Sequence, residues 1–168
     1  MNFSIEREKL LKPLQQVVGV VERRQTLPVL SNVLMVVDGD TLSLTGTDLE
    51  VELVARIGLE QSYSHAEITV PAKKLLDICK SLPDESVIQF ALDDQKLAIK
   101  AGRSRFSLAT LPANEFPNLE DAVGQVSFSM NQGYLKSVID RFSFAMAQQD
   151  VRFYLNGLLF EVSTNLLR

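Results

Sequence analysis

Hydrophobic residues recur every three to four positions in two segments of the chain, residues 6–21 and residues 71–82. Apolar residues at this spacing share one face of an α-helix, so both segments are predicted to be amphipathic helices. Pro71 stands at the start of the second segment, where a proline is well tolerated, and Pro13 is expected within the first turns of the other helix. The apolar positions that define the two faces are Leu10, Leu14, Val17, Val18, Val21, Leu75, Ile78, Cys79 and Leu82.

Shorter segments alternate apolar and polar residues or are rich in β-branched ones, which is typical of strands. The predicted strands are residues 31–37, 41–47, 49–60, 66–70, 86–92, 96–100 and 104–111. The Asp38-Gly39 pair is a strong hairpin signal and predicts a turn between the first two. The order strand, helix, strands is thus predicted to occur twice within residues 1–120. The pattern predicts an α+β fold with two helices side by side on a curved, mostly antiparallel sheet.

The sequence at the start of the chain is repeated further along. The segment that starts at Phe128 repeats the one that starts at Phe3, at one constant offset and without a gap. Leu10 then aligns with Leu135, and the match continues through the helix and loop into a strand. A repeat of this length indicates a domain duplication rather than a solenoid unit.

The repeat predicts the domain organisation. Residues 1–120 are expected to form one complete unit, and residues 126–168 the start of a second copy. Residues 111–125 combine two prolines with acidic residues and little periodicity, so a linker is predicted there. Because the second copy stops inside a strand that has nothing to pack on, we expect it to be truncated.

The amino-acid composition limits the cellular location and the partners that are expected for the protein. The 168 residues are 46% apolar, yet no apolar run is long enough for a membrane span and the start resembles no secretion signal. Cys79 is the single cysteine, which excludes an internal disulfide. We therefore predict a soluble, cytoplasmic protein without a membrane partner. The formal net charge of −4 means that a nucleic-acid partner would require the basic residues to be gathered on one face.

Catalytic motifs are absent from the sequence, and no cofactor or metal is expected. His65 is the only histidine and lies in a polar, loop-like stretch, so a surface position is predicted. Asp48, Glu50 and Glu52 are the one group that could form a divalent-metal cluster, as in a metal-dependent phosphodiesterase. Their alternation with apolar residues favours the solvent face of a half-buried strand instead.

Positive charges accompany the predicted helices. Lys73, Lys74 and Lys80 lie away from the apolar stripe of the second helix, and Lys9 and Lys12 away from that of the first. Further basic residues are Arg23, Arg24, Lys136 and Arg141. Basic faces on several helices of a duplicated unit favour a surface that meets a polyanion, with phosphate contacts that are independent of sequence.

Six ordered motifs carry a family resemblance: QTLPVLSN (25–32), LTGTDLE (44–50), VPAKK (70–74), GRSRFSL (102–108), LPANEFPNL (111–119) and QQDVRFYLNG (148–157). Along its whole length the chain resembles the bacterial sliding clamps, the beta subunit of DNA polymerase III. The resemblance implies a DNA-clamp fold with three similar domains per subunit and two subunits closed head to tail into a ring. Such a ring encircles double-stranded DNA, is loaded by a clamp loader and tethers the replicative polymerase. It is a non-catalytic part of the DNA polymerase holoenzyme.

The resemblance also implies residue roles. DNA contacts are implied for Arg24, Lys73, Gln149, Phe153 and Tyr154. The subunit contact is implied for Lys74, Arg103, Arg105, Phe106 and Leu108, on an expected edge strand whose Phe106 and Leu108 would be open to solvent. A partial partner-peptide pocket is implied for Arg152 and Leu155.

Two residues depart from the family pattern. Family members often have arginine where Lys73 stands and tyrosine where Phe153 stands, so a forked phosphate contact and a hydroxyl group are lost.

We expect that these 168 residues alone do not close the ring. The alternatives are the phosphodiesterase and a small monomeric regulator of clamp partners.

Overall fold

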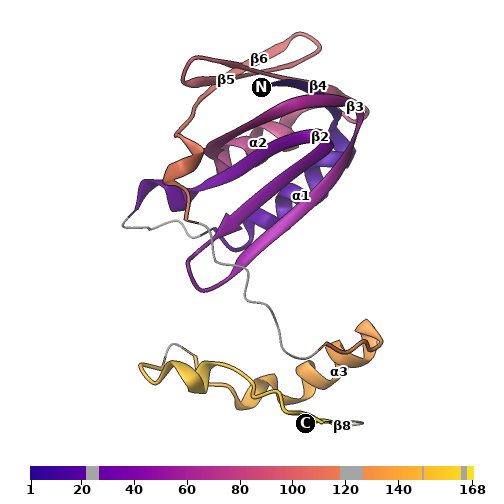
Figure 1. The fold of residues 1–168 in the computed structure, drawn as a ribbon, viewed down its shortest axis with the longest axis vertical. Coiled ribbons are helices and arrows are strands. Elements are labelled where there is room, and N and C mark those ends of the chain that lie inside the picture. The colour runs from indigo at the N-terminus through magenta and orange to yellow at the C-terminus, as the bar shows by residue number, and fades with distance from the viewer. Residues whose placement is uncertain (22–26, 118–126, 149, 164–165) are drawn as a thin grey trace. The chain divides into compact units, whose positions relative to one another are not determined.

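The computed structural model divides the chain into two compact units, Met1–Glu120 and Asp121–Arg168 (Figure 1). It describes all residues except 22–26, 118–126, 149 and 164–165, and the side chain of Phe153. None of the described helices has the length and apolar content needed to cross a membrane.

Unit 1 alternates helices with antiparallel strands (Figure 1). Its elements are β1 (Asn2–Glu6), α1 (Arg7–Val18), the short 3-10 helix η1 (Pro28–Ser31), β2 (Asn32–Thr47), β3 (Glu52–Pro71), α2 (Ala72–Ser81), β4 (Val87–Asp93), β5 (Lys96–Ala101), β6 (Ser104–Ala109) and η2 (Ala113–Glu115). The strands form a sheet of order β1-β4-β5-β6 and a second sheet of β2 and β3, and every pairing in them is antiparallel. The α+β class with two helices on curved antiparallel sheets is confirmed.

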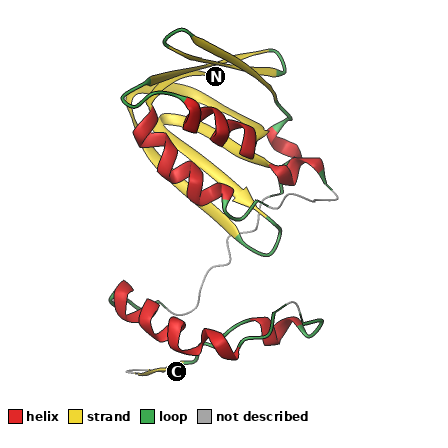
Figure 2. Cartoon of the chain, turned by 180° about the vertical axis from the view of Figure 1, so that it is seen from behind, coloured by secondary structure: helices red, strands yellow, loops and turns green. Residues whose placement is uncertain are grey.

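Helices α1 and α2 lie side by side over the same face of the β2–β3 sheet (Figure 2). Leu10, Leu14 and Leu75 have no exposed surface, as expected for apolar stripes that face the sheet. Pro13 is the seventh residue of α1, so the expectation that it lies in the first turns is wrong. The helix begins directly after β1, and burial of Leu10 and Leu14 on either side of the proline offsets the hydrogen bond that its missing N–H removes.

The four strands predicted between the helices belong to two long strands. The Asp38-Gly39 pair lies within β2, where the pairing with β3 changes register on both sides of Gly39. Gly39 has a φ of 56°, a conformation that glycine adopts without strain. The hairpin signal therefore marks an irregularity inside β2, while the chain reverses between β2 and β3 at residues 48–51.

One hydrophobic core joins α1, α2 and both sheets of unit 1. A smaller cluster lies beside it, where Phe116 packs with Val29, Leu30 and Leu34. The backbone of Leu111 also exchanges two hydrogen bonds with that of Thr69. The segment predicted as a linker thus begins with residues 111–116 packed on unit 1.

Unit 2 has little buried surface. Its elements are α3 (Gln132–Phe142), η3 (Ser143–Ala145), η4 (Phe153–Asn156), β7 (Val162–Ser163) and β8 (Leu166–Leu167). The Asn131 side chain caps α3 by accepting a hydrogen bond from the N–H of Tyr134. Helix α3 corresponds to the repeated helix predicted from the sequence, but it contains no fully buried residue.

Candidate nucleic-acid interface

The outward faces of α1 and α2 carry exposed lysines. Because the apolar stripe of each helix is packed on the sheet, Lys12 of α1 and Lys73, Lys74 and Lys80 of α2 extend from the helix layer into solvent. None of these four lysines forms an ion pair with the residues that the structure describes. They are available to neutralise phosphate groups.

Lys9 of α1 differs from these four lysines because it forms ion pairs with two glutamates. Its ammonium group lies 3.0 Å from the Glu60 carboxylate and 3.3 Å from that of Glu6. The hydrogen bond to Glu60, followed by that to Glu6, raises the pKa of Lys9. The charge of Lys9 is therefore already neutralised within the protein, in contrast to that of Lys12 one turn further along.

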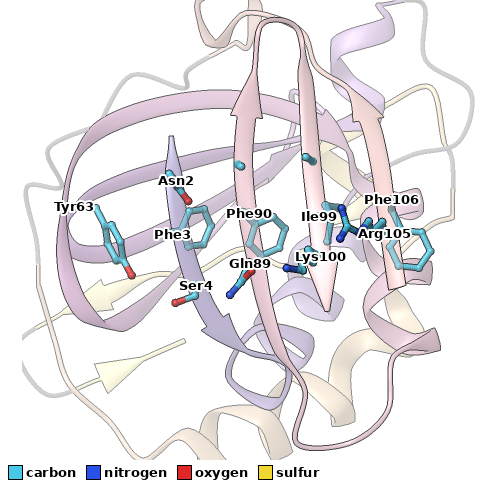
Figure 3. Close-up of a pocket in the computed structure, with 12 residues that line it drawn as sticks. Asn2, Phe3, Ser4, Tyr63, Gln89, Phe90, Ile99, Lys100, Arg105 and Phe106 are labelled. Carbon is cyan, nitrogen blue, oxygen red and sulfur yellow. The ribbon is translucent and has the colours of Figure 1, made fainter. Parts of the chain in front are cut away.

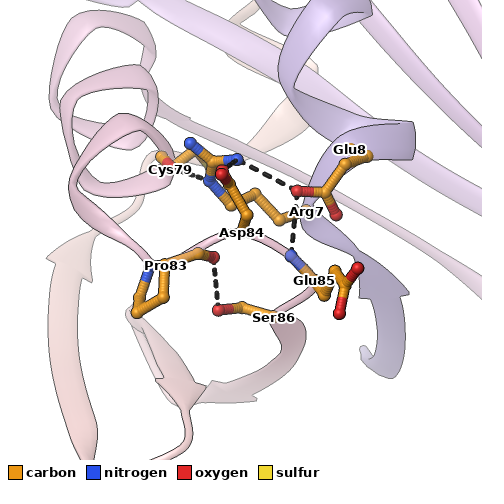
Figure 4. A network of polar contacts seen from close by, with 7 residues as sticks. All are labelled: Arg7, Glu8, Cys79, Pro83, Asp84, Glu85 and Ser86. Carbon is orange, nitrogen blue, oxygen red and sulfur yellow. Dashed lines mark hydrogen bonds and ion pairs between the residues drawn. The ribbon is translucent and has the colours of Figure 1, made fainter.

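Arg7 connects the start of α1 to the end of α2 (Figure 4). Its Nε donates a hydrogen bond of 2.9 Å to the carbonyl of Cys79, and its Nη1 lies 2.7 Å from Asp84 and 3.0 Å from Glu8. Glu8 in turn accepts a hydrogen bond from the N–H of Glu85. A cation at the carboxyl end of α2 and a carboxylate in the first turn of α1 both complement the helix dipoles.

This network fixes the helices relative to each other, because the start of α1 meets the end of α2 and the two helices run antiparallel. Sequence reasoning missed it. The acceptor on α2 is the main-chain carbonyl of Cys79, 72 positions away from Arg7, and no side-chain pattern marks such a partner.

The remaining predicted DNA contacts are Arg24, Gln149, Phe153 and Tyr154. Arg24 and Gln149 are outside the described residues, and for Phe153 the backbone of η4 is described but not the side chain. Tyr154 is 67% exposed. Of the five predicted contacts, Lys73 is thus the one that the structure sets on the exposed surface of a unit 1 helix.

Arg152 and Leu155, predicted for a partner-peptide pocket, lie close together in unit 2. The Arg152 guanidinium binds both carboxylate oxygens of Asp150, at 3.0 and 2.9 Å. This pair lowers the pKa of Asp150 and raises that of Arg152. Leu155 is 37% exposed, and its carbonyl accepts a hydrogen bond from the N–H of Ala147.

Four of the five residues predicted for a subunit contact lie on β6 or directly before it. This strand lies at the edge of its four-stranded sheet, as expected, and it contacts α2, the helix that carries the exposed Lys74. Arg103 and Arg105 are exposed, whereas Phe106 is partly buried. Leu108 is 7% exposed and belongs to the core, so the expectation that its side chain is open to solvent is wrong. The period of β6 directs Leu108 inward and Arg105 outward.

The acidic residues Asp48, Glu50 and Glu52 do not form a group suited to a metal ion. Asp48 Oδ1 accepts hydrogen bonds from the backbone N–H groups of Glu50 and Val51, at 2.9 and 2.7 Å, and closes the turn between β2 and β3. The carboxylate of Asp48 thus has a local structural role.

Comparison with known proteins decides the family. Residues 1–120 match the family model of the N-terminal domain of the DNA polymerase III beta subunit, and residues 129–168 match that of its central domain. The chain belongs to the DNA polymerase III beta subunit family. The resemblance carried by the six motifs is confirmed.

Relatives in this family align with the whole chain. A beta sliding clamp from Pseudomonas putida is 65% identical over 168 residues, and one from Escherichia coli K12 is 52% identical. Both alignments cover 100% of this chain and 46% of the relative, so the chain spans about half the length of the curated clamps it matches.

Solved structures of the family agree with the fold. The crystal structure of the beta subunit from Pseudomonas aeruginosa superimposes with a TM-score of 0.95 at 64% identity, over 99% of this chain and 45% of that one. The Caulobacter crescentus beta subunit gives a TM-score of 0.90 at 40% identity, over 98% of this chain and 44% of its own. The DNA-clamp fold is therefore shown for these residues.

Proposed function

We propose that the chain contributes to a ring that encircles duplex DNA, slides along it without sequence preference and tethers the replicative polymerase. The whole protein would act as a non-catalytic processivity factor of bacterial chromosomal replication in the cytoplasm. Residues 1–120 would supply one clamp domain and residues 126–168 the beginning of the next. The partners in this role are double-stranded DNA, a second subunit, the polymerase and the clamp loader.

The unpaired lysines on the helix layer are the observation that carries the proposal. Lys12, Lys73 and Lys80 extend from two helices on one side of unit 1 and have no acidic partner among the described residues. Lysine contacts to phosphate are sequence-independent and sensitive to salt, which suits a protein that moves along any sequence. The net charge of −4 limits indiscriminate binding to nucleic acid elsewhere on the surface.

Arg24, Gln149, Phe153 and Tyr154 would add contacts to those of Lys73. Subunit pairing would use the edge of β6, where Lys74, Arg103 and Arg105 are exposed and Phe106 is partly buried. Leu108 would contribute through its backbone, because its side chain lies in the core. Arg152 and Leu155 would form one part of a pocket for partner peptides. A polymerase held by such a pocket gains a high effective concentration at the primer end.

Salt dependence of DNA binding tests the proposal. Binding of this chain to a short labelled duplex is measured by fluorescence anisotropy at several salt concentrations, for the parent and for a variant carrying Lys12→Ala, Lys73→Ala and Lys80→Ala. The slope of log K against log salt is expected to flatten by about one for each lysine that contacts a phosphate. Duplexes of different sequence should be affected equally.

Lys9→Ala is the matched control, since it removes a lysine from the same helix layer whose charge is already held by Glu6 and Glu60. Its slope should remain that of the parent. An unchanged slope in the triple variant, or a loss confined to one DNA sequence, would contradict the proposal.

A further inference from the structure

Two exposed arginines of the proposed protein contacts have different surroundings. Arg105 of β6 is paired across the strands with Lys100 and lines a hollow of about 540 Å³ (Figure 3). It forms no ion pair with the residues that the structure describes. Arg152 of unit 2 binds a carboxylate instead, because its Nε and Nη2 lie 3.0 and 2.9 Å from the two side-chain oxygens of Asp150. One edge of the Arg152 guanidinium is thus fixed, although the side chain is 62% exposed.

Asp150 is in turn bound by Asn156. The side-chain oxygen of Asn156 accepts a hydrogen bond of 3.0 Å from the N–H of Asp150, and its side-chain nitrogen donates one of 3.1 Å to the carbonyl of Asp150. Both polar groups of the Asp150 backbone therefore bind the same side chain. Asp150 Oδ1 also accepts a hydrogen bond of 2.8 Å from the N–H of Arg152. The three residues form a chain of contacts that ends at the Arg152 guanidinium.

The repeat provides an internal comparison for this part of unit 2. At the constant offset of the repeat, η4 of unit 2 corresponds to η1 of unit 1. In unit 1 the N–H of Leu30 donates to the carbonyl of Leu27 at 3.1 Å. In unit 2 the N–H of Leu155 donates to the carbonyl of Arg152 at 2.9 Å. Equivalent residues therefore form the same main-chain turn in both copies.

The side chains at the network positions differ between the copies. The places of Asp150, Arg152 and Asn156 are taken in the first copy by Gln25, Leu27 and Ser31. Unit 1 thus forms the same turn without a carboxylate, a guanidinium or a side-chain amide at the last two of these places and without any charge at the first. The network is therefore not required for the main-chain conformation, and what it fixes is the side chain of Arg152.

We propose that Asp150 and Asn156 are positioning residues for Arg152 at the proposed partner-peptide pocket, so the inference rests on the proposed function. Asn156 fixes the backbone of Asp150, and the Asp150 carboxylate fixes the Nε and Nη2 edge of the guanidinium. Nη1 of Arg152 forms no hydrogen bond with the residues that the structure describes. Its N–H groups are available to donate to an acceptor of a partner peptide.

Phenylglyoxal modification of the whole chain, quantified for each arginine by mass spectrometry, tests the positioning. The reagent attacks the uncharged guanidine, and the hydrogen bond to Asp150 raises the pKa of Arg152. The rate at Arg152 is expressed relative to that at Arg105 in the same sample. Asp150→Asn should raise this ratio about threefold, the size expected of an exposed ion pair. Asn156→Ala should raise it about twofold, although this residue does not contact the guanidinium.

Glu161→Gln is the matched control. It removes the same charge from unit 2, where the Glu161 carboxylate lies 3.8 Å from the guanidinium of Arg168 and makes no contact with Arg152. The ratio should remain that of the parent. A rise equal to that in Asp150→Asn would indicate a general effect of net charge and would overturn the inference.

NMR separates positioning from a purely structural role. In Asp150→Asn the amide of Leu155 should keep the temperature dependence of a hydrogen-bonded N–H, because the turn persists, while the Nε–H signal of Arg152 should move. An unchanged phenylglyoxal ratio in either Asp150→Asn or Asn156→Ala would overturn the inference. So would loss of the Leu155 hydrogen bond together with the rise in the ratio, because the network would then support the turn. Neither measurement involves DNA, so failure here is distinguishable from failure of the proposed function.

Discussion

Replacing Arg7 by methionine should loosen the contact between α1 and α2. The Arg7 side chain is 13% exposed, and its guanidinium binds the Cys79 carbonyl, Asp84 and Glu8 (Figure 4). Methionine keeps most of the apolar stem but donates no hydrogen bond, so the carbonyl at the end of α2 loses this partner. The expected effect is therefore electrostatic rather than a loss of packing.

The structure sets the size of this effect. A hydrogen bond that involves a charged group contributes about 1.5–3 kcal/mol. The bond to the Cys79 carbonyl is the most shielded of the three, whereas Asp84 is 88% exposed and its ion pair adds little. The free energy of unfolding should thus fall by about 2 kcal/mol. For a unit of this size that corresponds to about 8 °C in Tm.

Thermal unfolding followed by circular dichroism measures this change, and amide hydrogen exchange locates it. Protection should be lost first at Glu85, whose N–H binds Glu8, and at Arg7, whose N–H binds the Ser86 carbonyl. Lys12→Met is the control, since it exchanges an exposed lysine on the same helix. Equal Tm values for the Arg7 and Lys12 variants would refute the reasoning.

Two further perturbations test the packing of unit 1. Gly46→Ala should lower Tm measurably, because the new Cβ would lie 2.8 Å from Val17 Cγ1 and 2.9 Å from the Val17 carbonyl, whereas Gly58→Ala, with no atom within 4 Å, should not. Burial raises the pKa of the Cys79 thiol to about 12. The unfolded thiol ionises near pH 8.5, so stability should fall by about 1.4 kcal/mol per pH unit between about pH 9 and 12. Denaturant titrations at pH 8 and pH 10 should show this slope in the parent and lose it in Cys79→Ala; equal slopes would contradict it.

Local periodicity predicted the helices and most strands, because their apolar faces are written directly in the sequence. Leu10, Leu14 and Leu75 are all buried as their spacing indicates. The Asp38-Gly39 signal was misread, since a dipeptide that favours a turn also accommodates an irregularity inside a long strand. Pro13 lies in the interior of α1 rather than in its first turn, because burial of Leu10 and Leu14 offsets the backbone hydrogen bond that the proline removes.

The candidate sites also contain some residues whose exposure the sequence predicts and others whose exposure it does not. Lys73 is exposed because it lies opposite the apolar stripe of α2, which the sequence already showed. Strand alternation puts Leu108 and Arg105 on opposite faces of the sheet. Which of the two faces the core depends on the register of β6 with β5, which pairs Leu108 with buried Leu97. The pairing of Lys100 with Arg105 has the same origin. Register between strands is therefore the information that local patterns did not supply.

Lysine footprinting tests the DNA-clamp account most directly. The chain is acetylated under limiting conditions with and without duplex DNA, and the modification of each lysine is quantified by mass spectrometry. DNA should protect Lys12, Lys73 and Lys80 on the helix layer, while the exposed Lys96 and Lys100 of β5 remain as reactive as before. Protection of the sheet lysines with the helix lysines unchanged would contradict the account.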